Sequence, residues 1–341
     1  IPAVRAPATQ SCTAGKSNAR RRVMRILVTG ATGFIGHSLV PVLRERGHEV
    51  TEMVRYVAGR FDSYGSPTKV FADLREDHSV REAVRMSQPE AIIHLAAMSA
   101  VAYSFAHQSE VTDVVFGGTL RLVEAARAFG VQHFISASSS EVYGGVINES
   151  DLPIKESHPL HAASPYGVAK IAADEYLNMV RRVYAFPITI VRPFNTYGRA
   201  LVGNRHFVVE RAITQALIDG VIRLHNPLPQ REFVFRDDHV SAYVRVVEQR
   251  DISQGKVYNV CRGFAYTIDD MVSKVSRLVS EATGKPRCRI IFEATPDRPR
   301  DIDVLLGDNT LIRKELGWTP TYDLEMGLRK AITEWRQVLQ K

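Results

Sequence analysis

Short apolar runs alternate with amphipathic stretches through the first half of the chain. The runs are continuous and contain few polar positions, which is typical of strands buried on both faces of a sheet. They predict six strands, at residues 25–28, 50–54, 69–72, 91–95, 134–136 and 188–191. Amphipathic helices are expected over residues 36–46, ended by Gly47, and over residues 112–129, ended by Gly130. This alternation predicts a parallel sheet covered by helices on both faces.

The pattern changes after Arg192 and Pro193, where the segments become irregular and rich in proline. The change predicts a second, smaller lobe, and residues 256–260 are expected to form a strand that returns to the sheet. The fold class is therefore α/β, a Rossmann-like doubly wound parallel sheet with a smaller C-terminal α/β lobe. Ligands of such sheets bind at the carboxyl ends of the strands.

Positive charge is concentrated at one end of the chain. The 341 residues carry a formal net charge of +7, and residues 1–25 hold six Lys or Arg and no Asp or Glu. The rest of the chain is therefore nearly neutral, which argues against a nucleic-acid-binding surface. We expect residues 1–23 to be a disordered basic tail, with a transit-like segment as the alternative.

Hydropathy and cysteine content exclude two further classes of protein. No apolar run approaches the ~18 residues that a membrane span needs. Cys12, Cys261 and Cys288 are far apart and form no CxxC pair, so neither a disulfide framework nor a metal site is expected. The prediction is a cytoplasmic protein without a membrane partner.

A glycine-rich turn, from Thr29 to Gly36, joins the first predicted strand to the first helix. Gly30 permits the tight turn, Gly33 lets the backbone approach a pyrophosphate, and Gly36 lets the helix pack against the strand. The helix start offers free N–H groups and a partial positive charge to phosphates. Residues 24–193 are therefore expected to be an NAD(P)-binding domain. The expected contacts in the turn are Gly30, Thr32, Gly33, Phe34, Ile35 and Gly36.

The end of the second strand bears on the choice between NAD and NADP. NAD-specific folds place an Asp or Glu there to hold the ribose hydroxyls, whereas this chain has Val54 followed by Arg55. A guanidinium suits the 2′-phosphate of NADP, so NADP is favoured and NAD stays open. Asp73, after the third strand, either accepts a hydrogen bond from the adenine amine or is an exposed loop carboxylate.

Tyr166 and Lys170 form the predicted catalytic pair, because their i, i+4 spacing places them on one helix face. An ammonium beside the phenol favours the phenolate, which can take a hydroxyl proton while hydride leaves the same carbon. Lys170 can also hold the nicotinamide ribose. Ser139 follows the fifth strand and can hydrogen-bond the reacting oxygen. Glu141 is either a second acid/base or a loop carboxylate without a chemical role.

Further motifs accompany these residues, and together they resemble the extended short-chain dehydrogenase/reductase family, the NAD-dependent epimerases and dehydratases of nucleotide sugars. Within that family they are most similar to the GDP-mannose 4,6-dehydratases. The resemblance covers nearly the whole chain from about Met24. The motifs are His94–Ser99, Val101–Phe105, Ser139–Glu141, Arg298–Asp308 and Leu316–Pro320.

The resemblance implies a redox-neutral cycle on a hexose. Hydride leaves C4 with Tyr166 as base, Glu141 takes the C5 proton and helps expel water from C6, and hydride returns to C6. A nucleotide-sugar-binding lobe at 194–231 and 261–341 is implied, with residues around 232–260 returning to the sheet. Implied cofactor contacts are Leu74, Leu95, Ala96 and Ala97. Implied substrate contacts are Ser99, Asn195, Arg231 and Arg298. A homodimer through residues 111–129 and 166–183 is implied as well.

Several reactions are consistent with these residues. The first is a GDP-mannose 4,6-dehydratase-like lyase with tightly bound NADP. The second is a 4-epimerase for a UDP-hexose or UDP-uronate with bound NAD, in which Glu141 is dispensable. A reductase that consumes free NADPH and a non-catalytic nucleotide-binding protein are the remaining alternatives.

Overall fold

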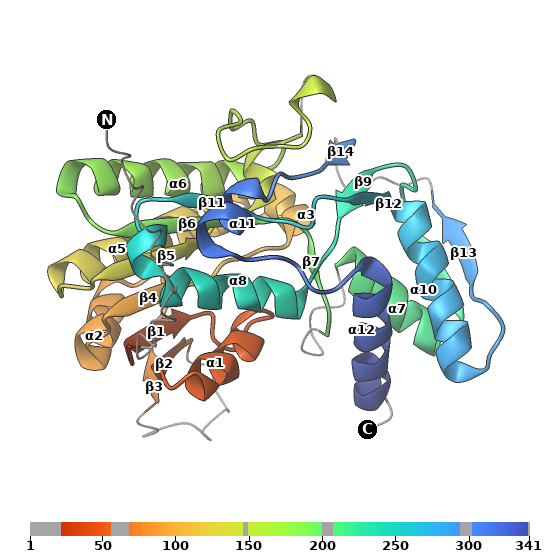
Figure 1. Ribbon diagram of the computed structural model, residues 1–341, viewed down its shortest axis with the longest axis horizontal. Helices are drawn as coiled ribbons and strands as arrows, with labels where there is room; N and C mark the ends of the chain where they lie inside the picture. The colour runs from red at the N-terminus through yellow and green to blue at the C-terminus, as the bar shows by residue number, and fades with distance from the viewer. Residues whose placement is uncertain (1–21, 56–67, 146–148, 200–206, 294–301, 340–341) are drawn as a thin grey trace, which may run out of the picture.

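Seven parallel strands within the described part of the chain form the central sheet (Figure 1). The fold is seen in a computed structural model that describes residues 22–55, 68–145, 149–199, 207–293 and 302–339. The strand order is β11-β6-β5-β4-β1-β2-β3. The strands are β1 (Arg25–Thr29), β2 (Glu49–Val54), β3 (Lys69–Phe71), β4 (Ala91–His94), β5 (His133–Ala137), β6 (Ile188–Pro193) and β11 (Val257–Val260). All six strands predicted in the first half are present, and the doubly wound α/β fold is confirmed.

Successive residues of the central strands point into two separate cores. Ile26 and Val28 of β1 pack in a core that contains residues of α1 and α8. Leu27, between them, packs in a core with residues of α2, α5 and α6. Both faces of the sheet are therefore buried, which explains why the apolar runs are continuous. These helices are α1 (Gly36–Glu45), α2 (Asp77–Ser87), α5 (Gly118–Ala128), α6 (Pro165–Tyr184) and α8 (Arg236–Glu248).

Strand β11 lies at one edge of the sheet, where Val257 pairs with Ile190 of β6. The sequence predicts this return over residues 256–260. Between the two strands the chain leaves the sheet and comes back through α8. The elements on this excursion are β7 (Thr196–Tyr197), α7 (Val208–Ile218), β8 (Val221–Leu224), β9 (Gln230–Glu232), β10 (Val234–Phe235) and α9 (Arg250–Ser253).

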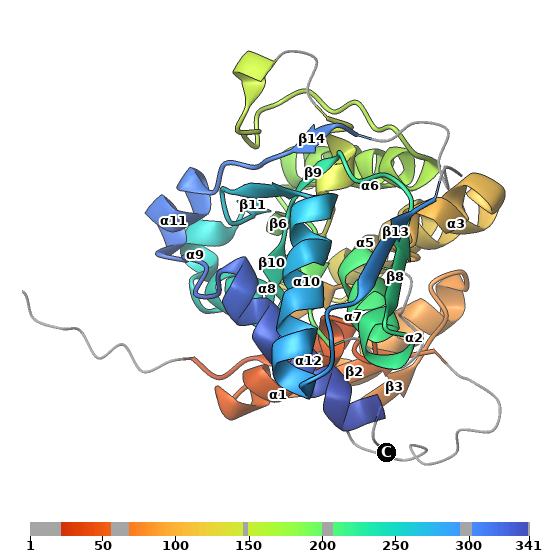
Figure 2. The same cartoon turned by 90° about the vertical axis from the view of Figure 1, so that its right-hand side faces the viewer.

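A second group of elements encloses a further core beside the sheet, which we call the second core (Figure 2). Helices α7, α10 and α12 pack there with β8 and β13, around the buried side chains of Phe233, Met271 and Trp335. Helix α10 begins with a capping box, in which Thr267 Oγ accepts from Asp270 N–H at 3.0 Å. The remaining elements are β12 (Ala265–Thr267), α10 (Ile268–Thr283), β13 (Arg289–Phe292), β14 (Val304–Leu305), α11 (Thr310–Leu316) and α12 (Leu324–Leu339).

The prediction of one continuous α-helix over residues 112–129 is wrong in its N-terminal part, where the helix is interrupted. Helix α4 (Gln108–Thr112) runs into a π-helical turn at Asp113–Gly117, and α5 follows. A Cβ at Gly117 would lie 2.8 Å from Asp113 Oδ1, and Arg121 Nη2 donates to the same oxygen at 2.9 Å. Wider turns of this kind are rare and occur mostly as single turns inside α-helices. Hydrophobic periodicity carries no signal for them.

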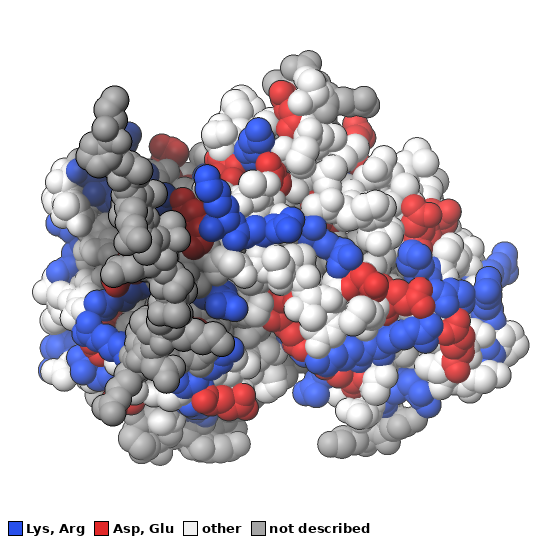
Figure 3. Space-filling model, in the orientation of Figure 1, with Lys and Arg blue, Asp and Glu red and all other residues white. Residues whose placement is uncertain are grey.

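The hydropathy, cysteines and surface charge of the described residues can be compared with the expectations from the sequence. Among the described residues, no helix combines the length and hydropathy that crossing a bilayer requires. Cys261 and Cys288 are free thiols, whereas Cys12 and residues 1–21 of the expected tail lie outside the described residues. Lys and Arg groups are interspersed with Asp and Glu groups on the face shown in Figure 3. This mixture agrees with the near-neutral body inferred from the sequence.

Candidate active site

Steric limits shape the glycine turn between β1 and α1. Gly30 has a φ of +68°, and a Cβ there would lie 2.8 Å from the backbone nitrogen of Ala96. A Cβ at Gly36 would overlap the Gly30 carbonyl oxygen, which accepts a hydrogen bond from Gly33 N–H at 2.9 Å. Within the described residues no side chain caps α1, and its first turn carries no acidic residue. The start of α1 therefore fits a pyrophosphate.

Phe34 connects this turn to the second core by packing. Its ring centroid lies 6.4 Å from that of Phe207, and the side chain packs against the buried residues of that core. Ile35 instead packs against the core between the sheet and helices α1 and α8, and Thr32 is exposed. The turn is thus held from both sides.

A buried hydrogen-bond chain fixes the carboxyl ends of β1 and β4. Thr119 donates its hydroxyl to a main-chain carbonyl at 2.6 Å, so its oxygen accepts from His94 Nε2 at 3.1 Å. His94 Nδ1 then accepts from the Thr29 hydroxyl at 2.8 Å, and Thr29 Oγ accepts from Ala96 N–H at 3.2 Å. Burial lowers the pKa of His94 to about 3, so the ring stays neutral. This chain fixes Leu95–Ala97, where the sequence predicts cofactor contacts.

Two guanidinium groups gather where β2 and β3 end. Arg55 follows β2 and is exposed. Arg75 binds Asp73 with Nη2 to Oδ2 at 2.6 Å and Nε to Oδ1 at 3.0 Å. These hydrogen bonds hold the pKa of Asp73 down at about 2, and the charge of Arg55 adds to the effect. Leu74 packs against α5 at Gly118. The contact of Asp73 with adenine stays a prediction, and Arg75 is a cation that sequence analysis missed.

The start of α6 positions Tyr166. Ser164 caps the helix by accepting from Gly167 N–H at 3.1 Å, and Pro165 occupies the first helical position. Ser104 Oγ accepts from the backbone N–H of Tyr166 at 3.2 Å. These contacts fix the backbone at Tyr166, whose side chain is buried.

Lys170 lies one helical turn beyond Tyr166, with Nζ 5.9 Å from the centroid of its ring. Its ammonium donates to the Ala137 carbonyl at 2.5 Å. Burial lowers the pKa of Lys170 to about 8. Burial raises the pKa of Tyr166, and the hydrogen bond with Ser139 opposes that rise. The structure therefore brings these three predicted side chains together at the carboxyl end of β5, and their chemical roles stay predictions.

Glu141 lies beside this group, on the short 3₁₀ turn η2 (Ser140–Val142). Ser139 Oγ accepts from Glu141 N–H at 3.2 Å, which fixes the turn. The Glu141 residue is 9% exposed, and its charge contributes to raising the pKa of Tyr166. A carboxylate thus lies within electrostatic reach of the phenol.

The predicted substrate residues occupy several elements. Ser99 is exposed after β4. Asn195 follows β6, and its carbonyl accepts from Val234 N–H at 2.9 Å. Arg231 is buried on β9, with Nη1 donating to a main-chain carbonyl at 3.0 Å. Arg298 lies outside the described residues. Their contacts with a substrate stay predictions.

A buried ion pair, not predicted from the sequence, lies next to Lys170. Arg192 Nε lies 3.0 Å from Asp174 Oδ2, and the two side chains are 4% and 1% exposed. Asp174 follows Lys170 by four residues on α6, so helical periodicity carried the signal that places it there. Arg192 lies on β6, and only the tertiary fold brings it to this place.

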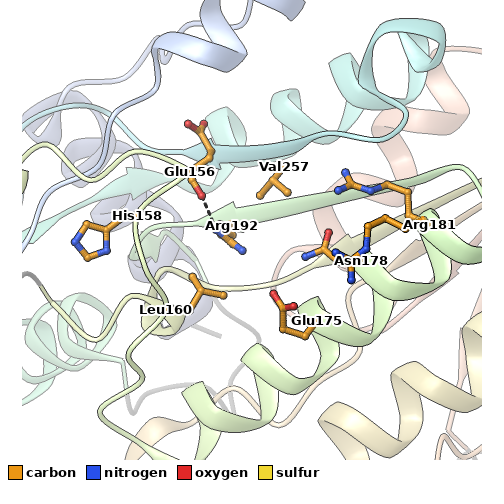
Figure 4. A pocket seen from close by; sticks show the side chains of 9 residues that line it. Glu156, His158, Leu160, Glu175, Asn178, Arg181, Arg192 and Val257 are labelled. Carbon is orange, nitrogen blue, oxygen red and sulfur yellow. Dashed lines mark hydrogen bonds between the residues drawn. The ribbon is translucent and has the colours of Figure 1, made fainter.

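A cavity of about 350 Å³ borders Arg192 (Figure 4). Its lining comes from α6, β6, β11 and the segment around Glu156. The carbonyl of Glu156 accepts from Arg192 Nη1 at 3.1 Å. None of the residues predicted to bind cofactor or substrate lines this cavity, which is therefore separate from the predicted catalytic group of Ser139, Tyr166 and Lys170.

A family model described as GDP-mannose 4,6 dehydratase matches residues 27–331. The chain belongs to the extended short-chain dehydrogenase/reductase family of nucleotide-sugar epimerases and dehydratases. The resemblance stated from the motifs is thereby confirmed. The protein is an NAD(P)-dependent enzyme that acts on nucleotide sugars.

Members of this family with different reactions are similar to this enzyme. The UDP-glucose 4-epimerase of Mycolicibacterium smegmatis is 32% identical, over 93% of this chain and 100% of its own. The dTDP-glucose 4,6-dehydratase of Streptomyces venezuelae, solved with NAD and TYD bound, is 26% identical with a TM-score of 0.79, covering 92% of this chain and 97% of its own. RMD from Pseudomonas aeruginosa, complexed with NADPH, is 25% identical with a TM-score of 0.75, covering 93% and 100%. Both reactions and both nicotinamide cofactors thus occur among similar proteins.

Proposed function

We propose that this enzyme is a nucleotide-sugar 4,6-dehydratase of the GDP-mannose type with tightly held NADP. Glu141 is the observation that carries the proposal, because its carboxylate lies largely buried beside Ser139 and acts electrostatically on Tyr166. Dehydration removes a proton from carbon as well as from a hydroxyl. It therefore needs an acid/base group in addition to the tyrosine.

Tyr166 acts in the first step. The phenolate takes the proton of the 4-hydroxyl while C4 is oxidised to a ketone, and the Ser139 hydroxyl holds the reacting oxygen. The Lys170 ammonium stabilises the phenolate. A bound nicotinamide supplies the acceptor for the C4 hydride and later the donor for C6.

Glu141 acts in the second step. The 4-keto group acidifies the C5 proton, which the carboxylate removes. The resulting carboxylic acid protonates the C6 hydroxyl as it leaves, so one water is lost and a C5–C6 double bond forms. Hydride is added at C6 and a proton from solvent at C5, and Tyr166 releases its proton to solvent, which restores the phenolate. The product is a 4-keto-6-deoxy sugar, and the cycle consumes no cofactor.

The preference for NADP is supported by Arg55 and Arg75, which both lie near the Asp73 carboxylate at the ends of β2 and β3. A guanidinium matches the geometry and charge of a phosphate. Mass spectrometry of the dinucleotide that co-purifies with the enzyme should find NADP. Recovery of NAD alone would contradict this part of the proposal.

The reaction is tested by incubating the purified holoenzyme with GDP-mannose. We expect the 4-keto-6-deoxy product without net consumption of cofactor. The Glu141→Gln variant should oxidise C4, seen as absorbance of the reduced nicotinamide, and lose no water. Failure of the wild type to convert any GDP-hexose would overturn the proposal.

A second candidate is a 4-epimerase for a UDP-hexose or UDP-uronate with bound NAD. It is favoured by the 32% identity with the mycobacterial UDP-glucose 4-epimerase. In that reaction the 4-keto intermediate rotates and is reduced again at C4 from its other face, so no C5 proton is removed. Full turnover of Glu141→Gln with a UDP-sugar would support this candidate over the dehydratase.

We also propose a homodimer formed through residues 111–129 and 166–183. Support comes from large apolar side chains exposed at or next to these helices, namely Phe129, Val168, Val183 and Tyr184. Sedimentation equilibrium should give twice the mass of the chain. A monomer at micromolar concentration would contradict the dimer.

A further inference from the structure

Asp174 and Arg192 form an ion pair that lies almost wholly inside the protein. The pair joins α6 to β6, with Nε 3.0 Å from Oδ2. Burying two charges is costly, and such pairs add little net stability compared with apolar residues. A buried pair one helical turn from Lys170 therefore points to an electrostatic role.

The carboxylate of Asp174 is bonded to the segment that carries the catalytic serine. Ser138 donates its hydroxyl to Asp174 Oδ2 at 2.9 Å. Ser138 stands between Ser139 and Ala137, and the Ala137 carbonyl accepts the Lys170 ammonium at 2.5 Å. Asp174 thus fixes the backbone that holds both the lysine and the serine.

Arg192 is fixed on its other side. Its Nη1 donates to the Tyr143 hydroxyl at 3.1 Å and to the Glu156 carbonyl at 3.1 Å. The second of these bonds is drawn in Figure 4, at the edge of the cavity. Tyr143 donates in turn to Asn259 Oδ1 at 2.7 Å. These contacts hold the guanidinium against Asp174.

Each charge in this series favours the ionised form of the next. Burial raises the pKa of Asp174, and the charge of Arg192 is the main influence that opposes the rise. Burial lowers the pKa of Lys170 to about 8, and the charge of Asp174 opposes that fall. Asp174 is therefore the anion that favours a protonated Lys170.

Other titratable groups also surround Lys170. His94 of β4 stays neutral, because burial lowers its pKa to about 3. Burial raises the pKa of the Tyr166 phenol, so its phenolate form depends on a nearby cation. Asp174 and Tyr166 of α6 and His94 of β4 interact with Lys170 directly. Glu141 of η2 acts on Tyr166, and Arg192 of β6 acts on Asp174.

We propose that Asp174 is a positioning residue that keeps the Lys170 ammonium charged and in place, and that Arg192 keeps Asp174 ionised. The inference rests on the proposed oxidation at C4, in which the ammonium stabilises the Tyr166 phenolate. Loss of the carboxylate charge then makes Lys170 release its proton at lower pH.

The pH dependence of turnover is the first test. The alkaline limb is the fall of kcat at high pH. In Asp174→Asn this limb should lie roughly one pH unit or more below its position in the wild type. Asp174→Glu should bring the limb back toward the wild type. Glu175→Gln is the matched control, because it removes the next carboxylate on α6, which is exposed to solvent. Its profile should equal that of the wild type.

A second test needs no sugar substrate. Trace acetic anhydride labels unprotonated amines. Mass spectrometry of the Lys170 peptide across pH therefore gives the titration midpoint of the Lys170 ammonium. Asp174→Asn holoenzyme should show a midpoint about one unit below that of wild type and Glu175→Gln. If this shift is present and no nucleotide sugar turns over, the proposed function fails and the role of Asp174 stands.

Arg192 provides a third variant. Arg192→Met should lower the Lys170 midpoint in the same direction, because an unpaired buried carboxylate takes up a proton. If Asp174→Asn does not fold, the double variant Asp174→Asn/Arg192→Met leaves no unpaired buried charge and should show the lowered midpoint. Identical midpoints in the folded Asp174 variant and Glu175→Gln would overturn the proposal.

Discussion

The glycine turn and the catalytic group lie at the same edge of the sheet and are built from different physical elements. At Gly30 and Gly36 an added Cβ meets backbone atoms that cannot move aside. Around Lys170 the contacts are instead between buried ionisable side chains. Substitutions should therefore disrupt the turn through steric collision and the predicted catalytic group through loss of charge. Damage to the first should be independent of pH, whereas damage to the second should vary with pH.

The largest expected effect separates chemistry from cofactor binding. Tyr166→Phe removes the hydroxyl that moves the proton and leaves the glycine turn intact. Turnover of the accepted nucleotide sugar should fall by ~10²–10⁴-fold. Cofactor affinity, measured by the fluorescence of added NADPH or NADH, should stay within a factor of a few. A parallel loss of affinity would show that the two regions are not independent.

Gly36→Ala tests the steric side of the comparison. The new methyl would overlap the Gly30 carbonyl, so the free energy of unfolding should fall by roughly 1–3 kcal/mol. Cofactor affinity should fall to the same extent at acidic and alkaline pH. Urea unfolding and NADPH or NADH titration measure the two effects.

Gly47→Ala is the control for that variant. Gly47 also has a positive φ, of +89°, but a Cβ added there would have nothing within 4 Å. It should lose stability through backbone strain alone and keep cofactor affinity. A loss of affinity equal to that of Gly36→Ala would mean that the collision at Gly36 is not the cause.

The wild-type pH profile tests the electrostatic side. Lys170 carries its proton below its pKa of about 8 and loses it above. Turnover should therefore fall on the alkaline side of about pH 8 as the phenolate loses its stabilising charge. Rates measured in buffers of constant ionic strength, on enzyme shown to be folded by circular dichroism, check this. A flat profile well above that pH would contradict it.

The smallest expected effect lies outside both regions. Thr267→Ala removes the capping box of α10, so the free energy of unfolding should fall by about 1 kcal/mol. Turnover and its pH profile should not change, because the buried apolar side chains of α10 pack in the second core. A shift of the alkaline limb in this variant would mean that the limb reports general stability.

The sequence allowed the sheet to be predicted because its strands are buried on both faces, as Leu27 between Ile26 and Val28 illustrates. Apolar runs of this kind leave a direct trace in the sequence. The π-helical turn at Asp113–Gly117 left none, because a wider backbone turn does not change the hydrophobic pattern of the segment. Local pattern therefore predicts that a helix is present and does not predict the hydrogen-bonding class of each of its turns.

The candidate site shows the same division. Tyr166 and Lys170 were predicted because one helix fixes their separation, and Ser139 because it follows a predicted strand. Arg192 escaped prediction because its place beside Asp174 depends on β6 packing against α6. Arg75 escaped because its pairing with Asp73 depends on how the loop after β3 turns.

Phe34 has a consequence for how the dinucleotide is retained. The residue belongs to the turn on which a pyrophosphate would lie, and its ring packs in the second core near Phe207. A motion that loosens the turn must therefore also disturb the packing between the two halves of the molecule. We therefore expect a dinucleotide bound at this turn to exchange slowly with bulk solution, as a cycle that regenerates its own cofactor requires.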